Sequence, residues 1–297
     1  MRKLFFLAFL LFFAAQAQAQ LQKTQVFLFD IEPIADTSYR FSNPRYLTGF
    51  NANGYNNHPS FVNDSLVYIS SQQPSESQPD IYELNLNRKT LIRVTSTAEG
   101  EFSPAQMPDE YNFSAVRQEF KQGDTLLRVW QFPIDRVGNG KPIMKYFNKT
   151  GYYEWIDGVR MAIFNVEDPN RLSVVDTRSD EEYDIARNVG RCFRMQPNGK
   201  LAYVQKSTFG DWTIMEKNIY QIRREPAEII QTLPGSEDFA VTRNGIIFMA
   251  KGSKIYKFNR YRDQNWVEIA DLRFYEIRDI SRLRLNYDDS KIAIVGK

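Results

Sequence analysis

A turn built around Asp or Asn recurs six times along the chain at nearly even intervals. The central residues are Asp64, Asp109, Asp157, Asn198, Asn244 and Asp289, and their spacing averages about 45 residues. Within a few residues each turn is followed by a short apolar segment: LVYI, FSAV, MAIF, LAYV, IIFM and IAIV. Self-similarity at this period indicates a repeat architecture in which one supersecondary unit is used six times.

Each copy is predicted to contain four short strands. In the first copy these are Pro59 to Phe61, Leu66 to Ile69, Asp80 to Leu84 and Leu91 to Thr95, segments that are rich in β-branched and aromatic residues. Third strands recur as LLRVWQF, RLSVVD, WTIMEK and KIYKF, whereas the fourth strands are less distinct. Four strands in this length match one propeller blade. We therefore predict an all-β fold, a six-bladed β-propeller of four-stranded antiparallel blades.

The two ends of the chain are predicted to share the last blade. After Asp289 only one further strand fits, KIAIVGK, so the sixth copy lacks its outer pair. The missing strands are available near the N-terminus as QVFLFDI and, after a polar loop, RYLTGF. We expect residues 25–50 to complete the sheet begun by residues 278–297, which removes the exposed sheet edges of an open ring.

The first residues predict export. Arg2 and Lys3 precede an apolar run from Leu4 to Ala15, with a small residue at Ala19. This pattern is typical of a secretory signal peptide, residues 1–19, and the run is too short to span a bilayer. With no cysteine near the cleavage site and no later apolar stretch of spanning length, we expect no lipid anchor and no membrane insertion. Residues 20–297 are then a single propeller domain.

The charge balance and the cysteine content limit the kinds of partner and of covalent cross-link that we expect. The chain has 38 Lys and Arg against 36 Asp and Glu, and removal of Arg2 and Lys3 leaves 36 of each sign. A neutral chain without a basic run gives no reason to expect nucleic acid as a partner. Cys192 is the sole cysteine, so no intramolecular disulfide forms, and we interpret its thiol as a small buried core group.

The first copies resemble the repeat of TolB-type propellers, a WD40-like repeat of the PD40 type. The segments HPSFVNDSLVYISSQ, DIYELNL and EFSPAQMPDEYNFSAVR are similar to that family's Pro-x-Phe-Ser-Pro-Asp-Gly, apolar strand and Asp-Ile-Tyr. The resemblance implies a periplasmic location; repeats of this type also occur in prolyl-oligopeptidase-like enzymes. TolB proteins carry an α/β domain before the propeller. Only about 30 residues separate the predicted cleavage site from the first full repeat here, so we expect the propeller alone.

Catalytic and metal chemistry find little support in the sequence. A hydrolase would need a Gly-x-Ser-x-Gly elbow, which is absent, and a catalytic histidine, for which His58 is the sole candidate. One histidine and one cysteine cannot form a tetrahedral metal site. Oxygen-only calcium sites fit the composition, but no EF-hand loop is present, and DEEYD at Asp180 to Asp184 is interpreted as a solvated loop. We therefore predict no enzyme activity, no catalytic residues, no metal and no cofactor.

Candidate binding residues lie around the inner strand of each copy. The loops before these strands form one mouth of the central channel, where propellers often bind ligands. The candidates are Asn57, His58, Glu101, Trp155, Arg191, Glu237, Asp238 and Arg282. Each also has a structural interpretation: the carboxylates pair with Arg191 and Arg282, and His58 caps the turn before Pro59.

Two classes of function remain open. The first is a monomeric binding or scaffold protein that holds an envelope protein over the channel mouth, and it requires salt-bridged carboxylates and a narrow channel. The second is a small-molecule or glycan-binding propeller with hydrolase or lyase activity. It requires two of Glu101, Glu237 and Asp238 to face an open pocket at roughly 5 to 10 Å separation. A receptor for a peptide terminus would need Arg191 and Arg282 to converge without acidic partners.

Overall fold

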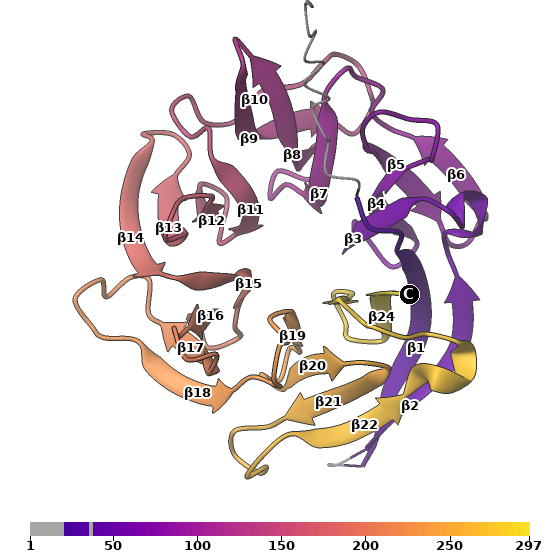
Figure 1. Ribbon diagram of the computed structural model, residues 1–297, viewed down its shortest axis with the longest axis vertical. Coiled ribbons are helices and arrows are strands. Elements are labelled where there is room, and N and C mark those ends of the chain that lie inside the picture. The colour runs from indigo at the N-terminus through magenta and orange to yellow at the C-terminus, as the bar shows by residue number, and fades with distance from the viewer. Residues whose placement is uncertain (1–20, 36–37) are drawn as a thin grey trace, which may run out of the picture.

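The strands form a ring of six blades around a central axis (Figure 1). The computed structural model describes residues 21–35 and 38–297. Each blade is a four-stranded antiparallel sheet, so the predicted six-bladed all-β propeller is confirmed. The signal peptide predicted at residues 1–19 lies outside the described residues. Among the residues that are described, no helix is long and apolar enough to cross a membrane.

Blades 1 to 5 follow one another along the chain. Blade 1 contains β3 (Tyr55–Phe61), β4 (Leu66–Gln72), β5 (Asp80–Asn85) and β6 (Thr90–Arg93). Blade 2 contains β7 (Gly100–Gln106), β8 (Asn112–Lys121), β9 (Asp124–Pro133) and β10 (Lys141–Pro142). Blade 3 contains β11 (Thr150–Trp155), β12 (Arg160–Asn165), β13 (Arg171–Asp176) and β14 (Glu181–Arg187). Blade 4 contains β15 (Val189–Met195), β16 (Leu201–Lys206), β17 (Trp212–Lys217) and β18 (Ala227–Gln231). Blade 5 contains β19 (Phe239–Val241), β20 (Ile247–Lys251), β21 (Lys254–Phe258) and β22 (Val267–Asp271).

Blade 6 combines segments from both ends of the chain. Its order is β2 (Ser38–Tyr46), β1 (Gln25–Ala35), β24 (Lys291–Gly296) and β23 (Arg282–Leu285). β1 pairs with β24 in antiparallel register, with Phe29 opposite Ile292. The outer strand β2 begins at Ser38, before the predicted strand RYLTGF. The segment predicted as a polar loop belongs to the sheet because its Tyr39 and Phe41 side chains pack against the core. A short 3-10 turn, η1 (Gly49–Asn51), follows it, and a second, η2 (Leu272–Tyr275), follows β22.

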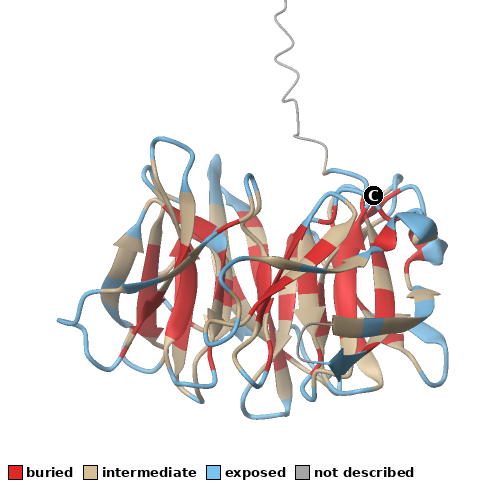
Figure 2. Cartoon of the chain, turned by 90° about the horizontal axis from the view of Figure 1, so that it is seen from below, coloured by how far each residue is buried: buried red, intermediate tan, exposed pale blue. Residues whose placement is uncertain are grey.

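The hydrophobic core is divided among the junctions between neighbouring blades. An aromatic residue recurs on the second strand of blades 1 to 5, and all five are buried: Tyr68, Phe113, Phe164, Tyr203 and Phe248. Tyr68 and Phe113 join blades 1 and 2 with ring centroids 5.1 Å apart. Burial is concentrated along the strands, whereas the loops at both ends of the ring are exposed (Figure 2). These rings therefore fill the space between neighbouring blades.

The outer strands depart most from the sequence prediction. The DEEYD segment is not a solvated loop, because Glu181–Arg187 form β14, the outer strand of blade 3. Arg171 on β13 holds this strand through ion pairs with Glu182 at 2.6 Å and Asp184 at 2.5 Å. Charged residues on an edge strand discourage pairing with other chains. Cys192 lies buried in the core, as predicted.

Candidate functional site

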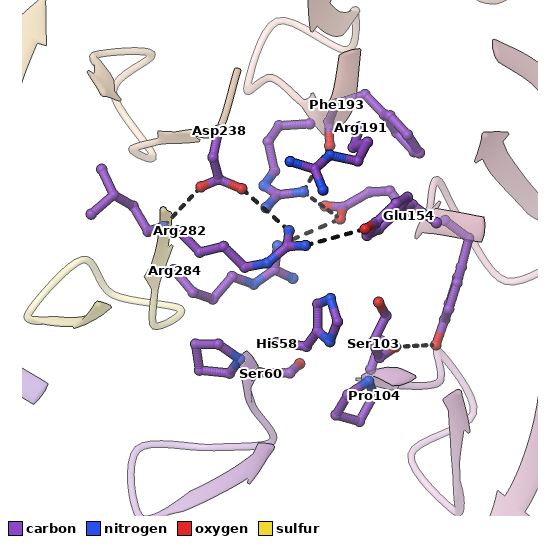
Figure 3. A pocket seen from close by; sticks show the side chains of 16 residues that line it. His58, Ser60, Ser103, Pro104, Glu154, Arg191, Phe193, Asp238, Arg282 and Arg284 are labelled. Atoms are coloured by element: carbon purple, nitrogen blue, oxygen red, sulfur yellow. Dashed lines mark hydrogen bonds and ion pairs between the residues drawn. The ribbon is translucent and has the colours of Figure 1, made fainter. Parts of the chain in front are cut away.

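The inner strands surround a narrow cavity on the axis of the ring. Its volume is about 80 Å³, and every blade contributes to its wall (Figure 3). Polar lining residues are His58, Ser60, Ser103, Tyr152, Glu154, Arg191, Arg194, Asp238, Arg282 and Arg284. Wider hollows lie at its two ends, one of about 200 Å³ beside Arg191 and Glu237 and one of about 420 Å³ beside Pro197 and Asp289. The channel is thus constricted at its middle.

Arg191 and Glu237 form an ion pair at one mouth of the channel. Arg191 Nε donates to Glu237 Oε1, and Lys206 Nζ lies 2.7 Å from the other carboxylate oxygen. Burial opposes ionisation of Glu237, but Arg191 and Lys206 outweigh it and hold the pKa of this carboxyl below its usual value. Glu237 is therefore an ionised, paired group rather than a proton donor at neutral pH.

Arg282 connects two further predicted residues. Its Nε donates to Asn57 Oδ1 at 2.7 Å, and its Nη1 lies 3.5 Å from Asp238 Oδ2. Asp238 also accepts a hydrogen bond from the backbone N–H of Leu283 at 2.8 Å. Burial raises the pKa of Asp238, whereas Arg282 acts in the opposite direction because its positive charge stabilises the ionised carboxylate. Since Arg191 and Arg282 both have acidic partners, the condition set for a peptide-terminus receptor at this pair is not met.

Glu101 and Trp155 do not line the cavity, contrary to prediction. Glu101 lies within β7 and faces Arg117, its direct partner on β8, whose Nε donates to Glu101 Oε1 at 2.9 Å. Its side chain is completely buried. Trp155 turns toward blade 2 and donates from Nε1 to Ser114 Oγ at 3.0 Å. Glu101 therefore contributes to the contact between two strands of blade 2, and Trp155 to the contact between blades 2 and 3.

We expect Glu101 to make stability depend on pH. Burial raises the pKa of Glu101 to about 7, against hydrogen bonds from Thr97 and Arg117 that favour the charged form. The folded state thus binds this proton more tightly than the unfolded state. Its contribution is fully present below the unfolded pKa of 4.5 and is lost as pH rises through about 7.

Glu101→Gln should reduce this pH dependence of the free energy of unfolding. The full effect in the native chain amounts to about 3 kcal/mol at most. Denaturant unfolding at pH 5 and pH 8 measures it, with Glu110→Gln, at an exposed position in the turn after β7, as the control. An unchanged difference between the two pH values in Glu101→Gln would contradict the assignment.

His58 and Ser103 occupy matching strained positions in blades 1 and 2. Their φ angles are +54° and +53°, and each is followed by a proline, Pro59 or Pro104, which disfavours helical backbone angles in the preceding residue. Both lie at irregularities in strand register, where a bulge re-aims side chains. His58 does not merely cap a turn, because its ring enters the cavity wall (Figure 3).

Glu154, Arg194 and Arg284 are cavity residues that sequence reasoning missed. Arg194 Nη1 and Arg284 Nη1 lie 3.4 and 3.5 Å from the same oxygen, Glu154 Oε2. Arg284 follows Arg282 by two positions, so the period of a strand places both on one face. That signal was available from the sequence, whereas Arg194 depends on a register irregularity between Val189 and Phe193.

No arrangement typical of a metal site accompanies this cavity. Within residues 21–35 and 38–297, no group of three or more His, Cys, Asp or Glu side chains is placed to hold a metal ion. The chemistry that the cavity offers is hydrogen-bond donation and positive charge, supplied by guanidinium groups, Tyr152, His58 and Ser103.

Known proteins match this chain in structure but not in sequence. No family model and no curated protein matches the chain. Putative TolB from Agrobacterium tumefaciens superposes with a TM-score of 0.62 at 11% identity, covering 92% of this chain and 98% of that one. TolB from Acinetobacter baumannii gives 0.57 at 11% identity, with 92% of this chain covered. The chain has the TolB-type propeller fold.

The chain spans 64% of the length of Acinetobacter baumannii TolB. An enzyme has a similar fold: oligogalacturonate lyase from Vibrio parahaemolyticus superposes with a TM-score of 0.52 at 13% identity, covering 93% of this chain and 98% of the lyase. At such low identities the likeness extends to the fold, and function has to be argued from the site.

Proposed function

We propose that this TolB-type propeller is an exported, non-enzymatic binding protein of the cell envelope that holds a partner protein over its channel mouth. One observation carries the proposal: each carboxylate considered for acid/base chemistry is paired with a cation. The pairs are Glu101 with Arg117, Glu237 with Arg191 and Lys206, and Asp238 with Arg282. Glycoside chemistry needs one carboxyl group free to give a proton and another free to act across an open pocket.

The mouth around Arg191 has the composition of a protein-binding surface. The Arg191 side chain is 52% exposed and its guanidinium lies 5.9 Å from the ring centroid of Tyr152. Arginine and tyrosine supply most of the binding energy in many protein interfaces because they combine large contact area with directed hydrogen bonds. The adjoining hollow of about 200 Å³ gives room for a side chain of the partner.

The alternative is a propeller that binds or cleaves a small molecule or glycan. The arginine-rich cavity favours an acidic ligand, since guanidinium groups bind carboxylates well. The likeness to a protein named oligogalacturonate lyase points the same way. Pairing of Glu237 and Asp238 argues for binding rather than cleavage in this case as well.

Charge reversal at the mouth tests the partner-binding proposal. Arg191→Glu should abolish capture of a specific protein from the envelope extract of the source organism, because it replaces an exposed donor with a repulsive carboxylate. The matched control is Arg40→Glu on outer strand β2, where an exposed arginine also pairs with a glutamate, Glu32. Affinity capture followed by mass spectrometry compares the native, Arg191→Glu and Arg40→Glu chains.

A protein retained by the native and Arg40→Glu chains but lost with Arg191→Glu would support the proposal. Recovery of the same proteins with all three, or of none with the native chain, would refute it and favour a small ligand.

A further inference from the structure

Two polar atoms at the central cavity are buried without a hydrogen-bond partner among the described residues. They are His58 Nε2 and Ser103 Oγ, on the inner strands of blades 1 and 2. An unsatisfied buried polar group costs about 1 to 3 kcal/mol. Two such groups lining one cavity indicate that a molecule outside the protein satisfies them.

Backbone strain at the same two residues has a matching implication. Each holds a left-handed backbone conformation in front of a proline, although neither is glycine. Such conformations persist where the surrounding structure enforces them, and they concentrate at binding sites. The bulges at His58 and Ser103 aim both side chains into the cavity, which regular strands would not do.

The cavity carries an excess of positive charge. Four guanidinium groups line it, on Arg191, Arg194, Arg282 and Arg284, together with two carboxylates, Glu154 and Asp238, and Arg191 is also paired with Glu237 at the mouth. The ion pairs of the other three arginines are long, 3.4 to 3.5 Å, and the shorter hydrogen bonds of Arg194 and Arg282 go to uncharged oxygens of Phe193 and Asn57. Burial, together with Arg282 and Arg191, holds the pKa of His58 well below its usual value, so its ring adds no charge at neutral pH. This excess of positive charge favours an anionic group at the site.

The size of the cavity limits the group that enters. Drug-sized ligands occupy pockets of about 300 to 1,000 Å³, whereas this constriction measures about 80 Å³. That space suits one small anionic group whose remainder lies in a wider hollow at either end. A carboxylate, with two oxygens, fits that space more readily than a tetrahedral phosphate group with three free oxygens.

We propose that the constriction binds a single carboxylate, with Arg194 and Arg284 holding its charge and with Ser103 Oγ and His58 Nε2 donating hydrogen bonds to it. His58 Nδ1 lies 3.2 Å from the hydroxyl of Tyr55, which places the ring proton on Nε2 when the tyrosine donates. This inference rests on the proposed binding function and names the group that is bound. The carboxylate comes from a protein partner, as a chain terminus or acidic side chain, or from a free organic acid.

The sole histidine of the chain makes the site directly observable. With histidine labelled in ¹³C and ¹⁵N, and with a purification tag that lacks histidine, every imidazole signal belongs to His58. Titration of the full mature chain with acetate should move the Nε2 signal in a saturable way, while chloride at equal ionic strength should not. Arg284→Gln should weaken acetate binding about tenfold or more, the effect of losing a charge-assisted hydrogen bond.

Ser103→Ala separates binding from folding. Its hydroxyl has no partner in the described chain, so its removal should leave the thermal midpoint unchanged or raised while weakening acetate binding severalfold. Arg40→Gln, on the outer rim, should bind acetate as the native chain does. The proposal fails if acetate gives no saturable shift, if Arg284→Gln binds acetate like the native chain, or if phosphate saturates the site and acetate does not.

Two further probes distinguish the sources of the carboxylate. An N-acetylated dipeptide with a free terminus is compared with its C-terminal amide, and galacturonate is compared with its methyl ester. Binding of the free acid but not of its neutral counterpart, in either pair, supports the site. If galacturonate binds and the dipeptide does not, the carboxylate site is supported and a protein partner is disfavoured. If the Arg191 mouth captures a protein but no carboxylate binds, the partner-binding proposal is supported and the carboxylate site is refuted.

Discussion

Phe29→Ala is expected to lower the free energy of unfolding by about 3 to 5 kcal/mol, the usual cost of removing a buried phenylalanine ring. Phe29 lies on β1 with its side chain completely buried. It packs edge-on against Phe41 of β2 and Tyr275 of η2, with ring centroids 6.1 and 5.1 Å away. The ring therefore ties the N-terminal strands to blade 5, and its loss leaves a cavity where blades 5 and 6 meet.

Ile34→Ala is the matched control. Ile34 lies on the same strand but is 56% exposed, so its truncation should change stability by no more than about 0.5 kcal/mol. Denaturant unfolding followed by tryptophan fluorescence compares the two variants with the native chain. Equal stability of Phe29→Ala and Ile34→Ala would mean that β1 does not complete blade 6 in solution.

Asp263→Ala should be similarly destabilising, by about 3 to 5 kcal/mol, because it leaves a buried ammonium group without its counter-ion. Lys257 on β21 has no exposed surface, and its Nζ lies 2.8 and 3.1 Å from the two carboxylate oxygens of Asp263. Asp263 also accepts from the backbone N–H of Asn259, which fixes the loop after β21. Removing both charges avoids the main penalty, so Lys257→Met with Asp263→Ala should recover most of the loss.

An exposed ion pair between β21 and β22 provides the comparison. Lys254 and Glu268 lie 2.8 Å apart with side chains 36% and 43% exposed. Glu268→Ala should cost no more than about 1 kcal/mol, because solvent screens the pair. Thermal and denaturant unfolding compare the three variants with the native chain. A double variant no more stable than Asp263→Ala would show that the buried charge is not the cause.

The number and order of the blades could be predicted because the inner half of each repeat obeys local rules. The turn and the apolar second strand are both buried or geometrically constrained in every copy, so the same residue types recur. Outer strands are half-exposed and lack that constraint. β14 was mistaken for a loop because Glu181, Glu182 and Asp184 carry no apolar alternation, and β10 is two residues long.

The site could be predicted in part for a related reason. Repeat position alone placed His58, Arg191, Asp238 and Arg282 at the cavity, with Asn57 bonded to Arg282. The prediction from repeat position was wrong where the pairing between strands decides which way a side chain points. Glu101 is matched with Arg117 across β7 and β8, and Ser103 and Arg194 depend on register irregularities that no local pattern announces.

The arrangement of blade 6 also sets when the protein can fold as it is made. β1 is among the first segments to leave the ribosome, yet its neighbour β24 is the last strand synthesised, with Gln25 opposite Gly296. Until that strand emerges, one side of β1 has no hydrogen-bonding partner and the interface between blades 6 and 1 cannot form. Pairing over such a separation is slow compared with local contacts. Synthesis therefore keeps the ring open until β24 is available, even though blades 1 to 5 are each built from consecutive strands.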